Sequence, residues 1–431
     1  MKRNNAQRKK NRSSRSRNAK AAGRSCLFCG KPLRVTFVDL GMSPLCESYV
    51  DRDHLNSMEP FYPLHVYVCE HCLLVQLNQY VSPEDIFSEY AYFSSYSESW
   101  VEHARVYTEM AIERFGLSST SHVVELASND GYLLQHFVRR GIPVLGVEPA
   151  ANIARVARQK KIPTLIEFFG VASAQRLKAR KKSADLIVGN NVLAQVPDIN
   201  DFVRGIKILL KPRGVVTIEF PHLLRLMEQN QFDTIYHEHF FYFSFASAER
   251  VFRHHGLELF DVEELPTHGG SLRIFAHHAN DKFHSVSARV HAMKAKEKKA
   301  GLHTVESYAA FSERVRELKR EILEFFIDAK VKGKRIAGYG APGKGNTLLN
   351  YCGIRSDFLE YTVDRNSYKQ GKYLPGTHIP IYAPDRIRET KPDIVFILPW
   401  NFKDEIMRQM SYIREWGGVF AVPIPSVTMY R

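Results

Sequence analysis

Residues 234–244 read TIYHEHFFYFS and set four side chains that can hold or pass a proton against an aromatic run. A metal site usually needs a third ligand and a histidine pair four residues apart on a helix, whereas His237 and His239 are two apart. Core packing suits the aromatic half, but buried ionisable groups such as Tyr236, Glu238 and His239 need partners. Because histidine titrates near neutrality, we predict a proton-transfer site, with core packing or a metal site as the alternatives.

Four of the six cysteines form two C-x-x-C pairs, CLFC and CEHC. No apolar secretory segment opens the chain, and paired C-x-x-C units then favour a metal over disulfides. Four thiolates can hold one tetrahedral Zn²⁺, which replaces the core that so short a segment cannot build. We predict a structural zinc site, with free buried pairs or a redox dithiol as alternatives. Its ligands would be Cys26, Cys29, Cys69 and Cys72.

A first glycine turn, VVELASNDGYLL, follows an apolar strand whose last residues include Glu125, and the next strand ends at Glu148. Acids at the ends of two successive strands suit a ribose diol but would repel a pyrophosphate. The pattern therefore favours S-adenosylmethionine over NAD, and a plain strand–helix crossover is the alternative. The expected cofactor contacts are Glu125, Ala127, Asn129, Gly131, Glu148, Asn190 and Asn191. The two asparagines could also be ordinary turn residues.

A second turn holds a complete G-x-G-x-x-G at Gly338, Gly340 and Gly343. With Asp364 at a later strand end, this pattern alone indicates NAD. Lys344 and the basic loop that follows Asp364 suit another diphosphate at least as well, and a nucleotide sugar fits here. The expected substrate contacts are Gly340, Gly343, Lys344, Asn346, Thr347, Lys369, Lys372 and His378.

The elements that must position these residues alternate between strand and helix. A chain of 431 residues predicts two or three domains, and 44% hydrophobic with 25% charged residues is typical of a globular protein. The N-terminal segment, 26–85, has short β-rich runs around its cysteines. Residues 86–300 and 301–431 each alternate strand with helix, which predicts two open parallel sheets that bind ligands at the carboxyl ends of their strands. A long charged helix is expected over 304–331.

The net charge of +14 is concentrated at the N-terminus. Residues 1–25 hold ten Lys or Arg and no acid, so subtracting these ten leaves +4 for the other 406 residues. We expect a basic disordered tail, with a weak RNA or anionic-surface tether as the alternative. No run of about 18 apolar residues occurs, so we expect no membrane partner and a cytoplasmic location.

The chain resembles the sugar C-methyltransferases of deoxysugar biosynthesis, which act on nucleotide-linked 4-keto hexoses. The likeness runs from Cys26 to the C-terminus. The blocks that carry it are CLFCGKPL, CEHCLLVQL, EYAYFSSYSESW, VVELASNDGYLL, GVEPAANIA, NNVLAQVPD, YHEHFFYFS, THGGSLRIF, GYGAPGKGNTLLNYCGI and KQGKYLPGTHIPI. This resemblance implies an α/β fold with a class I S-adenosylmethionine methyltransferase domain, a C-terminal Rossmann-like domain and a small N-terminal zinc-binding β domain.

The resemblance also implies residue roles. His239 would remove the C3 proton of the sugar, and Glu238 or Tyr236 would orient the imidazole or hydrogen-bond the enolate oxygen. Tyr90 matches another active-site tyrosine of the family. Where the family often has histidine in NNVLAHVPD, this chain has Gln195, which cannot carry a charge.

The resulting hypothesis is an S-adenosylmethionine-dependent C-methyltransferase, expected as a monomer, whose substrate is a 4-keto deoxyhexose linked to dTDP, CDP or GDP. An NAD-dependent oxidoreductase, a relative with a non-sugar substrate, and an RNA-associated protein remain as alternatives.

Overall fold

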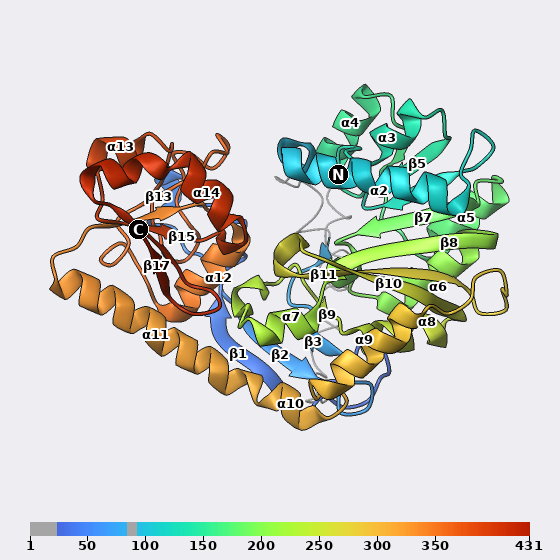
Figure 1. The fold of residues 1–431 in the computed structure, drawn as a ribbon, viewed down its shortest axis with the longest axis horizontal. Coiled ribbons are helices and arrows are strands. Elements are labelled where there is room, and N and C mark those ends of the chain that lie inside the picture. The colour runs from blue at the N-terminus through green and yellow to red at the C-terminus, as the bar shows by residue number, and fades with distance from the viewer. Residues whose placement is uncertain (1–23, 84–92) are drawn as a thin grey trace, which may run out of the picture.

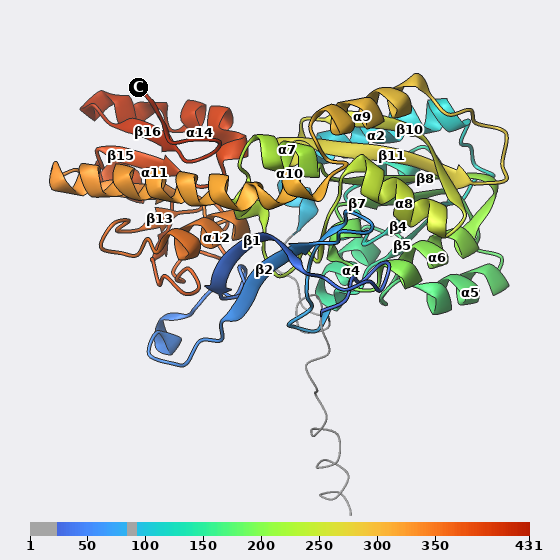
Figure 2. The same cartoon turned by 90° about the horizontal axis from the view of Figure 1, so that it is seen from below.

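The computed structural model describes residues 24–83 and 93–431. Tyr90 and nearly all of the basic tail lie outside the described residues. Two lobes stand side by side; helix α11 runs along the underside of one lobe, and strands β1 and β2 lie below the junction between the two (Figures 1 and 2). We call residues 24–83 the N-terminal module, the part from α2 to α9 the central lobe, and the part from α11 onward the C-terminal lobe.

The N-terminal module is built on a four-stranded antiparallel sheet in the order β1-β2-β3-β9. Its strands are β1 (Val35–Ser43), β2 (Tyr62–Val68), β3 (Val75–Leu77) and β9 (Phe241–Tyr242). The fourth strand comes from far along the chain, because Val75 pairs with Tyr242 and Gln76 with Phe241. The aromatic run after the YHEH block is therefore an edge strand of the N-terminal module.

The central lobe contains a seven-stranded sheet in the order β10-β11-β8-β7-β4-β5-β6. Strands β4 to β8 are parallel, and β11 joins antiparallel to β8 and to β10. The strands are β4 (Val123–Leu126), β5 (Val144–Val147), β6 (Thr164–Leu165), β7 (Ala184–Asn190), β8 (Leu210–Pro221), β10 (Leu257–Leu265) and β11 (Ser271–His278). The chain moves outward from β4 to β6 and then returns to the other side of β4, so the topological switch point lies between β4 and β7.

Helices cover both faces of this sheet (Figure 1). They are α2 (Glu98–Phe115), α3 (Leu134–Arg139), α4 (Ala151–Gln159), α5 (Val171–Ala179), α6 (Ile199–Leu209), α8 (Phe245–His254) and α9 (Ala288–Lys299). Helix α7 (Leu223–Glu228) instead buries its leucines in the core cluster that includes β1 and α11. The middle strands are buried on both faces, and every residue of VVEL and VLGV is buried; apart from Glu125 and Gly146 these residues are Val or Leu.

The C-terminal lobe repeats this plan with a six-stranded sheet in the order β14-β13-β12-β15-β16-β17. Its strands are β12 (Ile336–Tyr339), β13 (Thr362–Val363), β14 (Ile381–Tyr382), β15 (Ile394–Ile397), β16 (Val419–Val422) and β17 (Thr428–Tyr430), with only β17 antiparallel. Its shorter helices are α12 (Gly343–Cys352), α13 (Arg386–Thr390) and α14 (Lys403–Gln409). The switch point lies between β12 and β15.

The long charged helix is present, but it is divided into α10 (Val305–Ala309) and α11 (Phe311–Val331). One face of α11 buries apolar residues at helical spacing, among them Phe311, Val315, Leu318 and Ile322. These side chains share one core cluster with Phe37 of β1 and with the C-terminal sheet. The N-terminal module is therefore packed into the core of the C-terminal lobe. In the part of the chain that the structure describes, no helix combines the length and apolar character needed to cross a bilayer.

Candidate functional site

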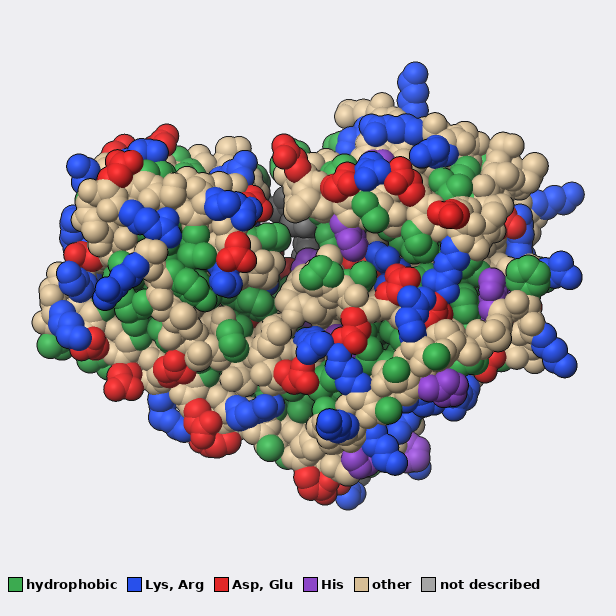
Figure 3. Space-filling model, in the orientation of Figure 1, with side chains coloured by type: hydrophobic (Ala, Val, Ile, Leu, Met, Phe, Trp, Pro, Cys, Tyr) green, Lys and Arg blue, Asp and Glu red, His purple; other side chains and the backbone are tan. Residues whose placement is uncertain are grey.

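A cavity of about 550 Å³ opens between the two lobes, where the carboxyl ends of both parallel sheets meet. The space-filling view shows the cleft between the lobes, with histidine side chains at its edge (Figure 3). Its walls come from the turns after β4, β5 and β7 on one side and from those after β12 and β15 on the other. Both switch-point crevices thus face one space, which is where open α/β sheets bind ligands.

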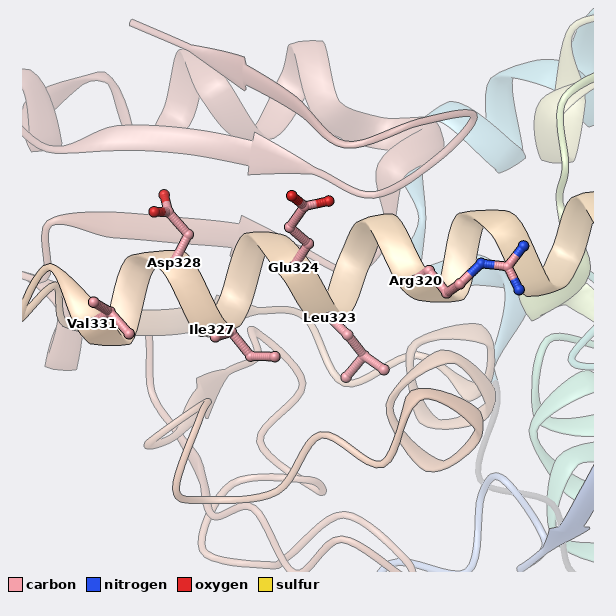
Figure 4. Close-up of a pocket in the computed structure, with 6 residues that line it drawn as sticks. All are labelled: Arg320, Leu323, Glu324, Ile327, Asp328 and Val331. Atoms are coloured by element: carbon pink, nitrogen blue, oxygen red, sulfur yellow. The ribbon is translucent and has the colours of Figure 1, made fainter.

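A second depression, of about 490 Å³, lies along α11 (Figure 4). All six of its lining residues come from this one helix, and Leu323 and Ile327 point to the opposite side from Glu324 and Asp328. No groups from other elements converge on it. The cavity between the lobes is therefore the candidate active site.

The central-lobe wall of the cavity carries carboxylate and amide side chains. Glu148, at the end of β5, lies there with its carboxylate accepting from the backbone N–H groups of Asn129 (2.9 Å) and Ala150 (2.8 Å). Burial raises the pKa of Glu148, and those two hydrogen bonds oppose the rise. This placement fits the predicted contact with a ribose diol.

Asn190 and Asn191 end β7 and also line the cavity. Both side-chain polar atoms of Asn190 are buried without a hydrogen-bond partner, as is Oδ1 of Asn191. A buried amide that lacks partners costs free energy, so these groups fit a polar ligand such as the nucleoside or amino-acid part of S-adenosylmethionine.

The first glycine turn has an unusual backbone. Ala127 (φ 54°) and Asn129 (φ 49°) line the cavity in the left-handed conformation, which non-glycine residues rarely adopt. The Cβ that any other residue would add at Gly131 (φ 78°) would overlap Ile162, so this glycine serves the turn rather than the cavity wall. Glu125 is buried beneath the turn and is not among the lining residues. Burial, with Glu148 and Asp130 nearby, raises its pKa well above the usual range.

The YHEH block lies at the meeting point of the three parts of the molecule. Tyr236, Glu238 and His239 all line the cavity, as predicted for a proton-transfer site. His237 instead points into the N-terminal module, where its Nε2 lies 3.3 Å from the carbonyl oxygen of Pro63. The four side chains therefore divide into a cavity group and one packing residue, and the described residues give no metal-ligand cluster here.

The hydrogen bond that orients the His239 ring comes from the main chain. Its Nδ1 lies 3.3 Å from the carbonyl oxygen of Thr234, so Nδ1–H donates and Nε2 keeps the lone pair. The ring of Tyr236 packs against the imidazole with ring centroids 4.3 Å apart. Glu238 accepts from the thiol of Cys46 at 3.7 Å. We expected Glu238 or Tyr236 to orient His239, and the structure shows Tyr236 in ring contact with the imidazole.

Burial is the main cause that lowers the pKa of His239 to about 4; the hydrogen bond to Thr234 opposes this shift, and the nearby His268 and Lys344 act in the same direction as burial. The imidazole is therefore neutral at pH 7 and able to accept a proton at Nε2.

Several cavity residues were not expected from the sequence. His268 follows β10 within the THGGS motif, and Trp100 lies at the start of α2. Cys46 and Glu47 reach the cavity from the N-terminal module. His268 has a local signal that could have found it, because a histidine before two glycines suggests a constrained turn; the other three have none.

The C-terminal wall carries the cavity's cations. Of the residues described as lining it, Lys344 and Lys369 are its only Lys or Arg, and both belong to this lobe. The Lys344 ammonium donates to Oδ1 of Asn401 at 2.8 Å and lies over the ring of Trp400 at 4.5 Å. Burial lowers the pKa of Lys344, while Asp233 opposes this shift. Trp400 in turn donates to Asp233 of the central lobe at 2.7 Å, and this bond joins the two lobes.

Side chains from neighbouring segments pack against the second glycine turn. Asp364 accepts from the backbone N–H of Ala341 at 2.7 Å, and the Tyr49 hydroxyl donates to the Ala341 carbonyl at 2.6 Å. A Cβ on Gly340 would lie 2.5 Å from Pro399, and one on Gly343 would lie 2.9 Å from the sulfur of Cys46. The carboxylate that a dehydrogenase would use for ribose is thus engaged with the turn itself. This arrangement disfavours the NAD interpretation.

The other expected substrate contacts fall into two groups. Gly343, Lys344 and Lys369 line the cavity, and Gly340 lies just behind them. The remaining four residues do not line it: Thr347 donates to the Ile235 carbonyl, Asn346 is buried in α12, Lys372 lies 3.7 Å from Asp51, and His378 lies 3.0 Å from Glu59. Lys372 and His378 are therefore balanced by acids of the N-terminal module, and we do not include these four residues in the substrate site.

The four predicted zinc ligands converge. Their sulfur atoms all lie within 4.8 Å of one another, with Cys26–Cys72 and Cys29–Cys69 each 3.6 Å apart. A tetrahedron with metal–sulfur bonds of about 2.3 Å has edges of about 3.8 Å, so the set fits Zn²⁺. Gln76 donates to the Cys26 sulfur at 3.2 Å and accepts from the Leu27 backbone at 2.7 Å, which supports the ligands from behind.

Family models match three successive parts of the chain: a zinc binding domain over 26–87, a methyltransferase domain over 100–262, and a C-methyltransferase C-terminal domain over 266–425. The C-methyltransferase NovU of Streptomyces niveus is 36% identical over 400 residues, which cover 93% of this chain and 95% of that protein.

Two solved structures resemble part of the chain. The PH0226 protein of Pyrococcus horikoshii matches at a TM-score of 0.37 and 14% identity, over 45% of this chain and 97% of that one. An S-adenosylmethionine-dependent methyltransferase of Clostridium acetobutylicum matches at 0.33 and 10%, over 42% and 92%.

The relative aligned along nearly the whole chain, the three ordered family matches and the cysteine cluster agree with one another. This chain belongs to the sugar C-methyltransferase family and is an S-adenosylmethionine-dependent methyltransferase with a zinc-binding N-terminal domain.

Proposed function

We propose that the enzyme methylates the carbon next to the keto group, C3, of a 4-keto deoxyhexose carried on a nucleoside diphosphate. The single observation that carries this proposal is the division of charge across one cavity. Glu148, Glu167, Asp198 and Asp201 lie on the central-lobe side, and both lysines of the lining, Lys344 and Lys369, lie on the C-terminal side, where Glu47 of the N-terminal module is 3.8 Å from Lys369. A cationic donor fits the first half and an anionic carrier fits the second.

His239 lies among the residues that join these halves, with its lone-pair nitrogen available. A keto group acidifies the neighbouring C–H bond, and Nε2 of His239 accepts that proton while the electron pair moves toward the carbonyl oxygen. The bound cofactor supplies an electrophilic methyl group on a sulfonium. The nucleophilic carbon would form the new C–C bond with this methyl group, and the electrons of the broken S–C bond would remain on the cofactor.

Each remaining residue has a binding role in this proposal. Glu148 holds the ribose diol of the cofactor, and Asn190 and Asn191 contact its polar parts. Lys344 and Lys369 hold the diphosphate, with Gly340 and Gly343 leaving room for it. Tyr236 packs His239 in place. Glu238 and Tyr90 stay predicted active-site residues, and Gln195 lines the cavity as a neutral hydrogen-bonding group where relatives often have histidine.

The test is the variant His239→Asn, which removes the base and retains a polar side chain. We expect exchange of the C3 proton with deuterated solvent and methyl transfer both to fall about 10²–10⁴-fold. S-adenosylmethionine affinity, measured by calorimetry, should stay unchanged. The matched control is His291→Asn on the exposed face of α9, which should behave as the wild type.

Near-normal proton exchange in His239→Asn would remove this residue from its proposed role. The nucleotide and the sugar are addressed separately, by mass spectrometry of ligands retained on the purified protein and by exchange assays with dTDP-, CDP- and GDP-linked 4-keto sugars. Exchange with none of these, combined with transfer to a compound that is not a sugar, would instead favour the relative with a different substrate.

A further inference from the structure

His268 occupies a position in the cavity that the proposed function leaves unused. It lies in the short turn Thr267–Gly269 between β10 and β11, and its ring meets the edge of Trp100 with centroids 5.2 Å apart. His268 and His239 both line this cavity. Two imidazoles thus face one reaction space.

The backbone of His268 is held in a conformation that histidine rarely adopts, with φ 53° and ψ 24°. Hydrogen bonds on both sides enforce it. The Thr267 hydroxyl donates to Glu219 at 2.9 Å, and the Gln231 amide donates to the Gly269 carbonyl at 2.9 Å. A Cβ on Gly269 would lie 2.5 Å from Trp400, so the turn also packs against the C-terminal lobe. Enforced backbone strain of this kind is typical of functional sites.

A second strained residue fixes the tautomer of His268. Asn191 (φ 56°) also has a left-handed backbone, and its Nδ2 donates to Nε2 of His268 at 3.1 Å. Because Nε2 accepts, the ring proton of the neutral imidazole resides on Nδ1. Burial, followed by the charge of Lys344, lowers the pKa of His268 to about 4, so the ring is neutral at pH 7. His268 is thus a neutral imidazole with a defined N–H group, whereas His239 is one with a defined lone pair.

We propose that His268 donates a hydrogen bond from Nδ1–H to the substrate carbonyl oxygen that becomes an oxyanion when His239 removes the neighbouring proton. This inference rests on the proposed function. The C–H electron pair moves into the new C=C bond, the C=O pair moves onto oxygen, and the proton passes to Nε2 of His239. The proton on His268 stays in place throughout, and the charge returns from oxygen as the carbon forms its bond to the methyl group.

The experiment measures exchange of the acidic C–H proton without S-adenosylmethionine, using the full-length enzyme. His268→Gly removes the ring and suits the left-handed backbone, so the fold should be retained. We expect exchange to fall about 10²–10³-fold, as when one oxyanion donor is lost, while S-adenosylmethionine affinity changes less than about twofold. Free imidazole should restore part of the rate, because it can occupy the vacated space.

His268→Asn keeps a side-chain N–H and tolerates the same backbone, so its exchange rate should lie between those of the wild type and the glycine variant. His291→Asn serves as the unaffected control. Wild-type exchange by His268→Gly, or a loss confined to cofactor affinity, would overturn the role of His268 and leave the proposed function intact. If the wild type exchanged no proton of any nucleotide-linked keto sugar, the proposed function would fail and this inference with it.

Discussion

The two imidazoles of the cavity make the chemistry sensitive to acid in a specific way. His239 has its pKa lowered to about 4 by burial, so it stays unprotonated well below the pH at which an exposed histidine gains its proton. If His239 is the base, the rate of proton exchange at low substrate concentration should stay flat from about pH 7 to pH 5 and fall only below that. A decrease in the exchange rate centred near pH 6.5 would instead indicate a different, more exposed base.

The same lowered pKa values make the folded protein less stable in acid. Between about pH 6.5 and pH 4 the unfolded chain binds protons at His239 and His268 that the folded chain does not bind. The free energy of unfolding should therefore decrease as the pH falls through this window and be fully recovered above it. Urea unfolding at several pH values measures this dependence, and His239→Asn should make it less steep.

Predicted residues lie near their expected positions where a local sequence pattern determines the position. The four cysteines, the acid after β5 and the amides after β7 all lie as expected, because strand ends and C-x-x-C turns are local features. Lys372 and His378 do not, because their acidic partners, Asp51 and Glu59, lie more than 300 residues earlier in the chain. His268 was missed although the two glycines after it are a local signal of a constrained turn; its tautomer could not be predicted, because it depends on a contact with Asn191 from another element.

At the level of elements, the four-cysteine cluster joins the segment before β1 to the turn between β2 and β3. Cys69 and Cys72 lie in the turn between β2 and β3, and the other two ligands lie before β1. Cys29→Ser should therefore lower bound zinc below one per chain, reduce the melting temperature and weaken methyl transfer, since β3 supports the segment that carries His239. Elemental analysis and thermal unfolding measure these effects.

Cys352→Ala is the matched control for this prediction, because Cys352 is buried in α12 and is not one of the clustered ligands. It should retain a full complement of zinc. If Cys29→Ser lost its zinc but kept full activity and an unchanged melting temperature, the prediction that the cluster supports the active site would be wrong.

Strands and helices of the two parallel sheets could be predicted because each has a periodic apolar pattern of its own. The strands expected at VVEL, VLGV and VVTIEF are present as β4, β5 and part of β8. The stretch FKDEIMRQMSYIREW does not form one continuous helix but α14 followed by a 3₁₀ segment, Ser411–Trp416. Strand β9 was not foreseen as part of the N-terminal sheet, since its two residues pair with β3 across a long stretch of sequence and leave no local periodicity.

Considered as a whole, the molecule builds one cavity from three parts, so contacts between parts should affect substrate binding. Gly343→Ala places a methyl group 2.9 Å from the Cys46 sulfur and forces the N-terminal loop away from the C-terminal turn. We expect a several-fold higher KM for the nucleotide sugar with unchanged affinity for S-adenosylmethionine, because the cofactor half lies on the other lobe. Steady-state kinetics and calorimetry distinguish the two.

The double variant Gly343→Ala with Cys46→Ala completes a mutant cycle. Removing the sulfur restores the space, so the KM should return close to that of Cys46→Ala alone, which gives a coupling free energy between two residues of different modules. Strictly additive effects would mean that the loop and the turn act independently.

Strand β9 has a consequence for how such enzymes can be recombined. The N-terminal sheet is completed by Phe241 and Tyr242, which begin two residues after His239. A cysteine-bearing module exchanged with that of another family member would thus meet a foreign edge strand, and the mismatch would be transmitted to the segment that carries His239. A functional chimera should therefore require the N-terminal module and the stretch from YHEH to β9 to come from the same donor protein.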